Sequence, residues 1–468
     1  MINTKLMGHQ EKIVNFTRDK EYSAIFSDYG TGKTLCALAH IQVTGVKKIL
    51  VISTKTSVVS TWVDEINTHT NFKYMCLIGS RTKKLQLLDY GFRISQISAG
   101  YYHSTKQYPI IFLLNFDGLK NIINELMNIK FDLVILDEST KVKSVKTLRT
   151  KLAWALGKSA KTKIIMTGFP VTEALHDIYA QVKFLDGGLA LGTSYYHFMD
   201  TYFVKYGSMY LPKKKMMASF LEKLKPFCIR VTNESLRLPP KIYKQVKVEK
   251  TLQQSKVLEQ LNSLFQLEFG KVKIDTQYIF TLIAKSLQIS DGFVQDQDGN
   301  LEVIDTNKDD ALLDLLDDID IRQNKIIIWC TFRFSVVKIQ KLIQKFIHSL
   351  RYNVSVLTLT GATKNVNLVV NQFQNSPTHN VLIAIQKKGS ASITLTSCKY
   401  AIYYSNAWSY DERYNSEARI YRKGSEKHKN VIYTDLLVKG TIDERVYQCL
   451  RKKKSLVDML KNDFLHLS

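Results

Sequence analysis

The sequence has no apolar run long enough to cross a membrane. Its longest apolar segments, such as residues 108–116, have only the length of a buried strand. The first ten residues, MINTKLMGHQ, contain no apolar core of the kind found in a secretory signal. These absences argue against a membrane or secreted protein, and we expect a cytoplasmic protein with no membrane partner.

Paired cysteines are missing as well. The six cysteines are scattered, with no C-x-x-C pair, which suits a reducing cytosol and argues against a disulfide framework or a zinc ribbon. His103, His176 and His197 show no metal-ligand spacing, so the sequence predicts no zinc site, and His9 is simplest to explain as a structural residue.

Acidic residues are too few to balance the basic ones. The 468 residues include 66 Lys and Arg against 42 Asp and Glu, which gives a net charge of +24. Such a surplus attracts polyanions, of which nucleic acid is the commonest. A lysine-biased genome is the alternative, and clusters such as residues 213–215 and 451–454 are individually typical of a solvated face. Charge alone thus favours a nucleic-acid partner.

Short β-rich apolar runs alternate with helical patterns, which indicates an α/β protein with doubly wound parallel sheets. Residues 171 to about 236 and 251–290 are helical in pattern, and the prolines of LPPK (Leu238 to Lys241) interrupt them. The aromatic stretch 193–207 within this region fits either base stacking or, more simply, a helix core. The predicted strands are 47–53, 109–115, 131–137 and 162–168, then 324–330, 353–359, 380–386, 399–405 and 430–437.

This pattern predicts two lobes with helical insertions between them. We place the first lobe at 1–235, with a helical insertion from about residue 171. A linker with a second helical insertion covers 236–300, and the second lobe covers 301–468.

The stretch SDYGTGKT (Ser27 to Thr34) has the pattern of a phosphate-binding loop, with Ser27 at the usual place of the first glycine. A short apolar strand pattern precedes it and a helical pattern follows. Backbone N–H groups and Lys33 would hold phosphate there, and the Thr34 hydroxyl would reach Mg²⁺. The expected nucleotide-binding residues of this stretch are Asp28, Gly30, Thr31, Gly32, Lys33 and Thr34.

Two carboxylates follow a buried strand in FDLVILDEST (Phe131 to Thr140). Asp137 and Glu138 stand at the carboxyl end of that strand, where an open α/β sheet binds its ligand. Asp137 can hold Mg²⁺, and Glu138 can orient and deprotonate an attacking water. The alternative, a solvated acidic turn, leaves the upstream phosphate loop unexplained.

Two arginines lie in ERYNSEARIYRKGS (Glu412 to Ser425). Arg419 and Arg422 are three residues apart, which places both on one face of a predicted helix. Arginines so placed can reach a γ-phosphate across a cleft as arginine fingers. Without the other motifs, the segment would be only a basic helix.

With these motifs in this order, the chain resembles the Swi/Snf group of superfamily-two helicases, which are ATP-driven DNA translocases with two RecA-like lobes. The resemblance covers almost the whole chain. Residues 8–16 resemble the adenine-recognition element, in which Gln10 reads the base. The other matching stretches are 27–34 (motif I), 49–66 (Ia), 110–120, 136–147 (II), 164–173 (III), 177–186 and 225–241 (diagnostic of the group), 326–342 (IV), 382–412 (V) and 412–425 (VI).

The resemblance implies the roles of particular residues, with ATP and Mg²⁺ as cofactors. It implies a catalytic set of Lys33, Asp137, Glu138, Arg419 and Arg422, with Thr34 and Asp137 on the magnesium, and nucleotide-to-DNA coupling through Thr167, Gly168 and Gly389. ATP would bind between the lobes, so hydrolysis would require closure. DNA would lie across both lobes, held by largely sequence-independent phosphate contacts. The positions suggested for DNA contacts are Ser53, Thr54, Lys55, Asn115, Thr331, Arg333, Lys387 and Lys388.

The chain departs from the family pattern in several places. Motif II reads DEST in place of DEAH, motif V has Ser390 and Ser392 where glycine is usual, and Asn415 and Ser425 replace glutamines of motif VI. These changes concern coupling more than hydrolysis. The motifs run almost from end to end with no chromatin-reader domain, which resembles a bacteriophage or bacterial member acting in the host cytoplasm.

The biological task of such a motor stays open between alternatives. It would remodel branched DNA by branch migration or fork reversal, together with replication or recombination proteins, or it would displace proteins such as RNA polymerase from duplex DNA. An RNA helicase is a further alternative, which the LPPK region disfavours. A DNA-binding protein with an inactive site, or another phosphate-loop ATPase, explains fewer of the motifs.

Overall fold

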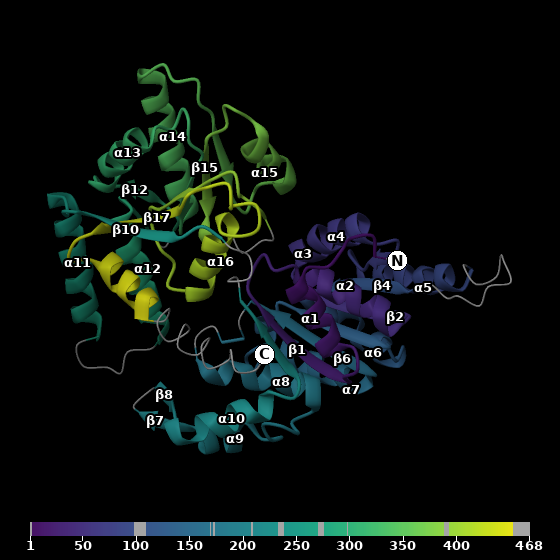
Figure 1. Cartoon of the computed structure of the whole chain (residues 1–468). Coiled ribbons are helices and arrows are strands. Elements are labelled where there is room, and N and C mark those ends of the chain that lie inside the picture. Colours follow the sequence, from purple (N-terminus) through teal and green to yellow (C-terminus); the bar gives the residue numbers. More distant parts are fainter. Residues whose placement is uncertain are drawn as a thin grey trace. The chain divides into compact units, whose positions relative to one another are not determined.

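The computed structural model describes residues 2–97, 109–168, 170–171, 174–206, 209–232, 238–269, 276–296, 298–387 and 393–452. The chain divides into two compact units, one within Met1–Leu236 and the other within Arg237–Ser455. Figure 1 shows that each unit is a central sheet with helices packed against it.

The first unit is built on a seven-stranded sheet in the order β3-β4-β2-β5-β6-β1-β9, and every strand pair in it is parallel. The central strands are continuous apolar runs because helices cover both faces. The strands are β1 (Tyr22–Ser27), β2 (Lys48–Ser53), β3 (Lys73–Cys76), β4 (Ile110–Asn115), β5 (Leu133–Asp137), β6 (Thr162–Thr167) and β9 (Cys228–Val231).

Helices α1 (Gly8–Thr17), α2 (Lys33–Thr44) and α4 (Thr61–His69) share one hydrophobic core with the sheet, which includes Ile13, Leu38 and Trp62. A second set of helices packs on the same sheet: its first and last members contact the strands, and the two between them pack against their helical neighbours. This set is α5 (Arg81–Ile97), α6 (Leu119–Asn128), α7 (Leu148–Ser159) and α8 (Ile178–Asp186), and the short helices are α3 (Lys55–Val59), η1 (Phe116–Gly118), η2 (Ser139–Val142) and η3 (Leu175–Asp177).

The predicted first insertion contains more than helices. It comprises α9 (Tyr195–Tyr202), a hairpin of β7 (Phe203–Tyr206) and β8 (Met209–Pro212), η4 (Lys214–Met216) and α10 (Met217–Leu224). The chain then returns to the main sheet as β9, parallel to β1. Neither the hairpin nor β9 was predicted. Half of the Phe and Tyr side chains in the described part of 193–207 are core: Phe198, Tyr202 and Phe203 are buried against one another, whereas Tyr196 and Tyr206 are exposed.

The second unit has a six-stranded parallel sheet in the order β10-β17-β16-β13-β15-β14. Helices α13 (Lys308–Ile319) and α14 (Arg333–Ser349) pack on one face, and α15 (Val366–Asn375) and the end of α16 (Tyr410–Ile420) pack on the other. The strands are β10 (Lys241–Val248), β13 (Ile326–Cys330), β14 (Val356–Leu359), β15 (Val381–Ile385), β16 (Tyr400–Tyr403) and β17 (Val431–Val438).

The nine strands predicted at the sequence level are all present within a few residues, and the α/β class with two doubly wound parallel sheets is confirmed. The predicted helical stretch 251–290 contains α11 (Leu252–Phe269) and α12 (Thr276–Ser290), followed by a hairpin of β11 (Phe293–Gln295) and β12 (Leu301–Val303). Within the six-stranded sheet, the unpredicted strand is β10, which pairs with β17 along its whole length. Because of that pairing, the residues directly after LPPK belong to the second sheet.

Candidate active site

The phosphate-loop sequence lies between β1 and α2, as predicted. Gly30 and Gly32 have φ angles of +85° and +81°, a left-handed conformation that glycine adopts without strain. A Cβ added to Gly32 would lie 2.3 Å from Nε2 of Gln10. Gly32 is therefore required both by the backbone conformation and by the close approach of Gln10.

Ser27 has a specific role in this loop. Its hydroxyl lies 2.6 Å from Oγ1 of Thr31, which donates to the carbonyl of Asp28 at 2.7 Å. Lys33 Nζ donates to the Ser27 carbonyl at 2.7 Å. The side chain that replaces the usual glycine thus ties the two ends of the loop together.

Gln10 lies directly against the phosphate loop and is buried. Its Oε1 accepts from the backbone N–H of Met7 at 2.9 Å, and its Nε2 donates to the Thr31 carbonyl at 3.0 Å. His9 Nε2 lies 3.0 Å from the same carbonyl, a contact that holds α1 against the phosphate loop. The predicted reading of an adenine base by Gln10 remains a prediction.

Lys33 and the two acidic residues of motif II are brought together in the first unit. Burial lowers the pKa of the Lys33 ammonium, and the carboxylates of Glu138, Asp137 and Asp28 oppose that shift. Tyr29 bridges the two motifs: its ring centre lies 4.7 Å from Lys33 Nζ, and its hydroxyl lies 3.4 Å from Oε2 of Glu138. The site therefore combines a half-buried cation with carboxylates, as a nucleotide site requires.

Asp137 is held by three donors from the segment after β2. Its Oδ2 accepts from Ser53 Oγ at 2.8 Å, Trp62 Nε1 at 3.0 Å and Ser57 Oγ at 3.3 Å. Ser53 is completely buried and its hydroxyl orients the Asp137 carboxylate, while the DNA contact suggested for this position stays a prediction. The sequence contained no signal for these contacts, although motif Ia supplies all three residues.

The oxygen donors here fit Mg²⁺, which prefers carboxylate and hydroxyl ligands together with substrate phosphates. Asp137 is a buried carboxylate at the end of β5, and Thr34 stands in the first turn of α2. Within the described ranges, no cluster of three or more His, Cys, Asp or Glu residues could hold a metal by itself.

Glu138 has a strained backbone. Its φ and ψ angles are +55° and +52°, in the left-handed region that is unfavourable for residues with a Cβ. Such strain persists only where the surroundings fix it, and it is common at active sites. The next residue, Ser139, donates to Gln181 Oε1 at 2.7 Å, and Gln181 in turn donates to the Pro170 carbonyl at 2.8 Å, which links motif II to motif III.

Arg230 is a site residue that the sequence analysis missed. Its fully buried guanidinium on β9 pairs with Asp28 of the phosphate loop and donates from Nη1 to the Gly168 carbonyl at 2.7 Å. A Cβ on Gly168 would meet the Tyr29 ring at 2.8 Å, while Thr167 is buried at the end of β6. The predicted coupling residues Thr167 and Gly168 therefore adjoin the phosphate loop.

The two candidate arginine fingers do not share a helical face. Helix α16 ends at Ile420, so Arg419 lies in its last turn and Arg422 lies beyond it. Tyr421 leaves the helical conformation, with φ −111° and ψ 81°. Both guanidinium groups nevertheless reach one acceptor, the Ile393 carbonyl, at 3.5 Å from Arg419 and 3.2 Å from Arg422. Arg419 Nε also donates to the Asn415 carbonyl at 3.0 Å.

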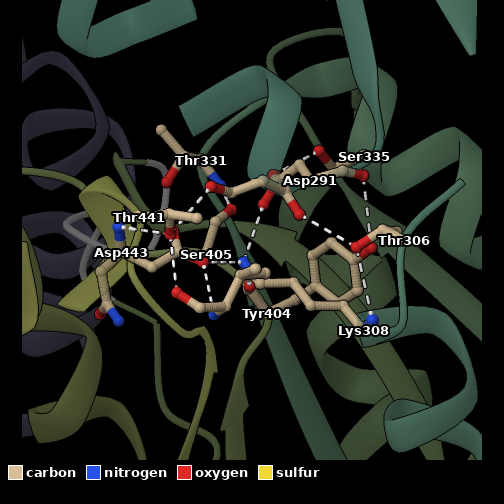
Figure 2. A network of polar contacts seen from close by, with 12 residues as sticks. Asp291, Thr306, Lys308, Thr331, Ser335, Tyr404, Ser405, Thr441 and Asp443 are labelled. Carbon is tan, nitrogen blue, oxygen red and sulfur yellow. Dashed lines mark hydrogen bonds and ion pairs between the residues drawn. The ribbon is translucent and has the colours of Figure 1, made fainter. Parts of the chain in front are cut away.

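The second unit contains a buried ionic network that contacts motif IV through Ser335 (Figure 2). Lys308 Nζ lies 3.3 Å from Asp291 Oδ1 and 2.6 Å from Asp443 Oδ2, and all three side chains are buried. Ser335 on α14 donates to Asp291 at 2.7 Å. Burial alone would lower the pKa of Lys308, but the two carboxylates outweigh it and raise the pKa above its usual value. Burial raises the pKa of Asp291.

The remaining positions suggested for DNA contacts stay predictions. Lys55, Arg333 and Lys387 are exposed, and Thr54, Asn115 and Thr331 are partly exposed. Thr331 follows β13, and its backbone N–H donates to Ser405 Oγ at 3.0 Å. Lys388, Gly389, Ser390 and Ser392 lie outside the described residues.

Comparison with known proteins identifies the class. The family model of the SNF2-related domain matches residues 9–296, and that of the helicase conserved C-terminal domain matches residues 307–424. Because the first match covers more than half of the chain, the protein belongs to the SNF2-related family. This confirms the predicted Swi/Snf-like class within the superfamily-two helicases.

Individual relatives are distant. An uncharacterized ATP-dependent helicase of Mycoplasma genitalium is 26% identical over 356 residues, which cover 74% of this chain and 32% of that protein. A protein of Acyrthosiphon pisum secondary endosymbiont phage 1 is 27% identical over 209 residues, 42% of each chain. The Sulfolobus solfataricus SWI2/SNF2 ATPase core, solved with double-stranded DNA, is 23% identical with a TM-score of 0.44; the match covers 99% of this chain and 94% of that one. This chain thus spans about a third of the length of the Mycoplasma relative.

No helix in the described part of the chain is long and apolar enough to cross a membrane.

Proposed function

We propose that this protein hydrolyses ATP to ADP and phosphate and uses the reaction to move along DNA. The observation that carries the proposal is the convergence of the half-buried Lys33 with Asp137 and Glu138 at the phosphate loop. Family membership supports it, since the matched Mycoplasma protein is named an ATP-dependent helicase.

In the proposed reaction, the phosphate loop and Lys33 bind the phosphates of ATP. Asp137 and Thr34 would hold Mg²⁺, which neutralises phosphate charge when bound. Glu138 orients a water molecule and accepts its proton as the water oxygen attacks the γ-phosphorus. The bond from that phosphorus to the β–γ bridging oxygen breaks, and ADP leaves. Asp137, fixed by Ser53 and Trp62, keeps its orientation during this step.

Arg419 and Arg422 would complete the site by stabilising charge on the transferred phosphoryl group. Their shared place beside the Ile393 carbonyl, within motif V, supports a joint role. We propose that hydrolysis therefore requires the two units to close on ATP. DNA would contact both units mainly through its phosphates, so binding would weaken as salt rises.

For the biological task, we propose remodelling of branched DNA by branch migration or fork reversal in replication, recombination or repair, in the cytoplasm of a bacterium or of a phage host. The high net charge and the compact set of motifs support a motor that acts on DNA. The alternative task is displacement of proteins such as RNA polymerase from duplex DNA.

Two substrates separate these tasks. A synthetic four-way junction measures ATP-dependent branch migration, and a duplex carrying a bound protein roadblock measures displacement without strand separation. Migration of the junction with an intact roadblock supports the first task, and the opposite result supports the second. Stimulation by RNA alone would favour an RNA helicase, and tight DNA binding with no ATP turnover would leave a non-enzymatic DNA-binding protein.

A further inference from the structure

We propose that Lys241, the last residue of the LPPK segment, is a positioning residue for Arg419 and Arg422. The inference rests on the proposed function, in which these arginines act on ATP. Lys241 is the first residue of β10, the strand at the edge of the second unit's sheet. It lies near the start of the second unit, which begins at Arg237.

Lys241 contacts the arginine-bearing segment at two points. Its Nζ lies 3.7 Å from Oε2 of Glu417 on α16 and 4.1 Å from the ring centre of Tyr421. Tyr421 stands between the two arginines in the sequence, at the position where the helix ends. A cation over an aromatic face is attracted to the electron-rich ring, and more strongly as water is excluded. Lys241 thus packs on Tyr421, which lies between Arg419 and Arg422 in the chain.

Glu417 is the anchor of this contact and is itself firmly held. Its Oε1 accepts from Arg413 Nε at 2.8 Å, and its Oε2 accepts from the Tyr243 hydroxyl at 2.8 Å. Burial, reinforced by Glu417, raises the pKa of Tyr243 far above its usual value, so this hydroxyl stays a donor. The backbone carbonyl of Glu417 accepts from the Tyr433 hydroxyl at 3.1 Å.

Arg413 and Lys241 have different tasks in this arrangement. Arg413 forms a two-pronged pair with Asp435 on β17, which fixes the body of α16 to the sheet. Lys241 reaches past the end of the helix to Tyr421. Because Arg422 lies outside the helix, its place depends on the packing of Tyr421 and on the bond to the Ile393 carbonyl. A shift of the Leu238–Lys241 segment would therefore act first on Tyr421 and Arg422 and, through Glu417, on the last turn of α16 that carries Arg419.

The test compares Lys241→Met with Lys241→Arg in steady-state ATP hydrolysis at saturating duplex DNA. Methionine keeps the length of the side chain and removes its charge. We expect kcat to fall on the order of 10- to 10²-fold, as for a catalytic group displaced by about 1 Å, with KM for ATP and DNA affinity unchanged. Arginine keeps the cation over Tyr421 and should retain most of kcat.

Lys247→Met is the matched control. Lys247 lies on the same strand and pairs with Glu444 at 2.9 Å, away from α16. Its loss should leave kcat unchanged. Tyr421→Leu, which leaves the Lys241–Glu417 pair in place, should reproduce the loss of kcat even if Lys241→Met lowers thermal stability.

The inference is overturned if Lys241→Met and Tyr421→Leu keep kcat within about twofold of wild type while Arg419→Ala loses about 10³-fold or more. If wild type itself shows no DNA-stimulated turnover, the proposed function fails, and the failure is then not one of positioning.

Discussion

Asp28 in the phosphate loop and Arg230 on β9 form a buried ion pair, although 202 residues separate them in the chain. The same guanidinium donates to the Gly168 carbonyl, so one side chain fixes the phosphate loop, the end of β6 and the edge strand together.

The first prediction concerns this pair. Arg230→Met leaves the Asp28 carboxylate without its buried counter-charge, and we expect a loss of about 3–5 kcal/mol in the free energy of unfolding. Denaturant unfolding, followed by tryptophan fluorescence, measures it. The double variant Asp28→Asn/Arg230→Met removes the uncompensated charge and should recover much of the lost unfolding free energy. If the double variant is as unstable as Arg230→Met alone, the uncompensated Asp28 charge is not the cause of the loss.

The two ends of α2 provide a matched pair of glycines. Gly32 and Gly45 both have positive φ, but a Cβ on Gly32 would lie 2.3 Å from Gln10, whereas a Cβ on Gly45 meets no atom within 4 Å. Gly32→Ala should weaken ATP binding on the order of 10²-fold. Gly45→Ala should cost about 1–2 kcal/mol of stability and leave ATP affinity unchanged. Titration with a fluorescent ATP analogue checks both, and equal affinities would contradict the account of the loop.

Trp62 should affect catalysis through Asp137. Trp62→Phe keeps an aromatic ring in the core and removes the indole N–H that donates to Oδ2 of Asp137. Loss of such a supporting hydrogen bond typically costs about 10- to 100-fold in metal affinity or activity. ATPase rates as a function of Mg²⁺ concentration measure the effect. Trp154→Phe, whose indole donates to the Ala180 carbonyl, is the control and should leave the Mg²⁺ dependence unchanged.

The Lys308 network predicts unequal effects of its members. Lys308→Met leaves two buried carboxylates uncompensated and should cost about 3–5 kcal/mol of unfolding free energy. Asp291→Asn leaves the Lys308–Asp443 pair intact and should cost clearly less. Urea unfolding of the two variants compares them, and a larger loss for Asp291→Asn would contradict this charge balance.

The same network predicts a pH dependence. Burial raises the pKa of Asp291 in the folded protein, so its protonated form contributes stability below the unfolded pKa, and this is lost as pH rises through the folded pKa. Lys308, with its raised pKa, contributes stability that is lost only in the alkaline range above its usual pKa. As pH rises through the acidic range, the unfolding free energy of wild type should therefore decline. It should decline less in Asp291→Asn, because an asparagine does not titrate.

The sequence was informative where one physical signal dominates. Continuous apolar runs such as Leu133–Asp137 exist because both faces of a parallel strand are covered, and all nine such runs were predicted. β10 was missed because it is an edge strand in which exposed and half-buried residues follow no regular period, and paired prolines precede it. β9 was missed because four residues are too few to show a period.

The site shows the same division. Motif spacing identified Lys33, Asp137 and Glu138, because phosphate chemistry restricts which residue types can occupy those positions. It did not indicate Arg230 or the donors to Asp137, since contacts between residues 75 or more apart depend on sheet order. The shared face of Arg419 and Arg422 was wrong because the spacing alone cannot show that α16 ends between them.

The most direct test of the account is the steady-state rate of ATP hydrolysis by wild type and Glu138→Gln, without polymer and with duplex, single-stranded, forked and four-way DNA. The account predicts strong stimulation of wild type by DNA and loss of turnover in Glu138→Gln, with DNA binding retained. No turnover by wild type with any of these DNA forms, despite tight binding, would contradict it.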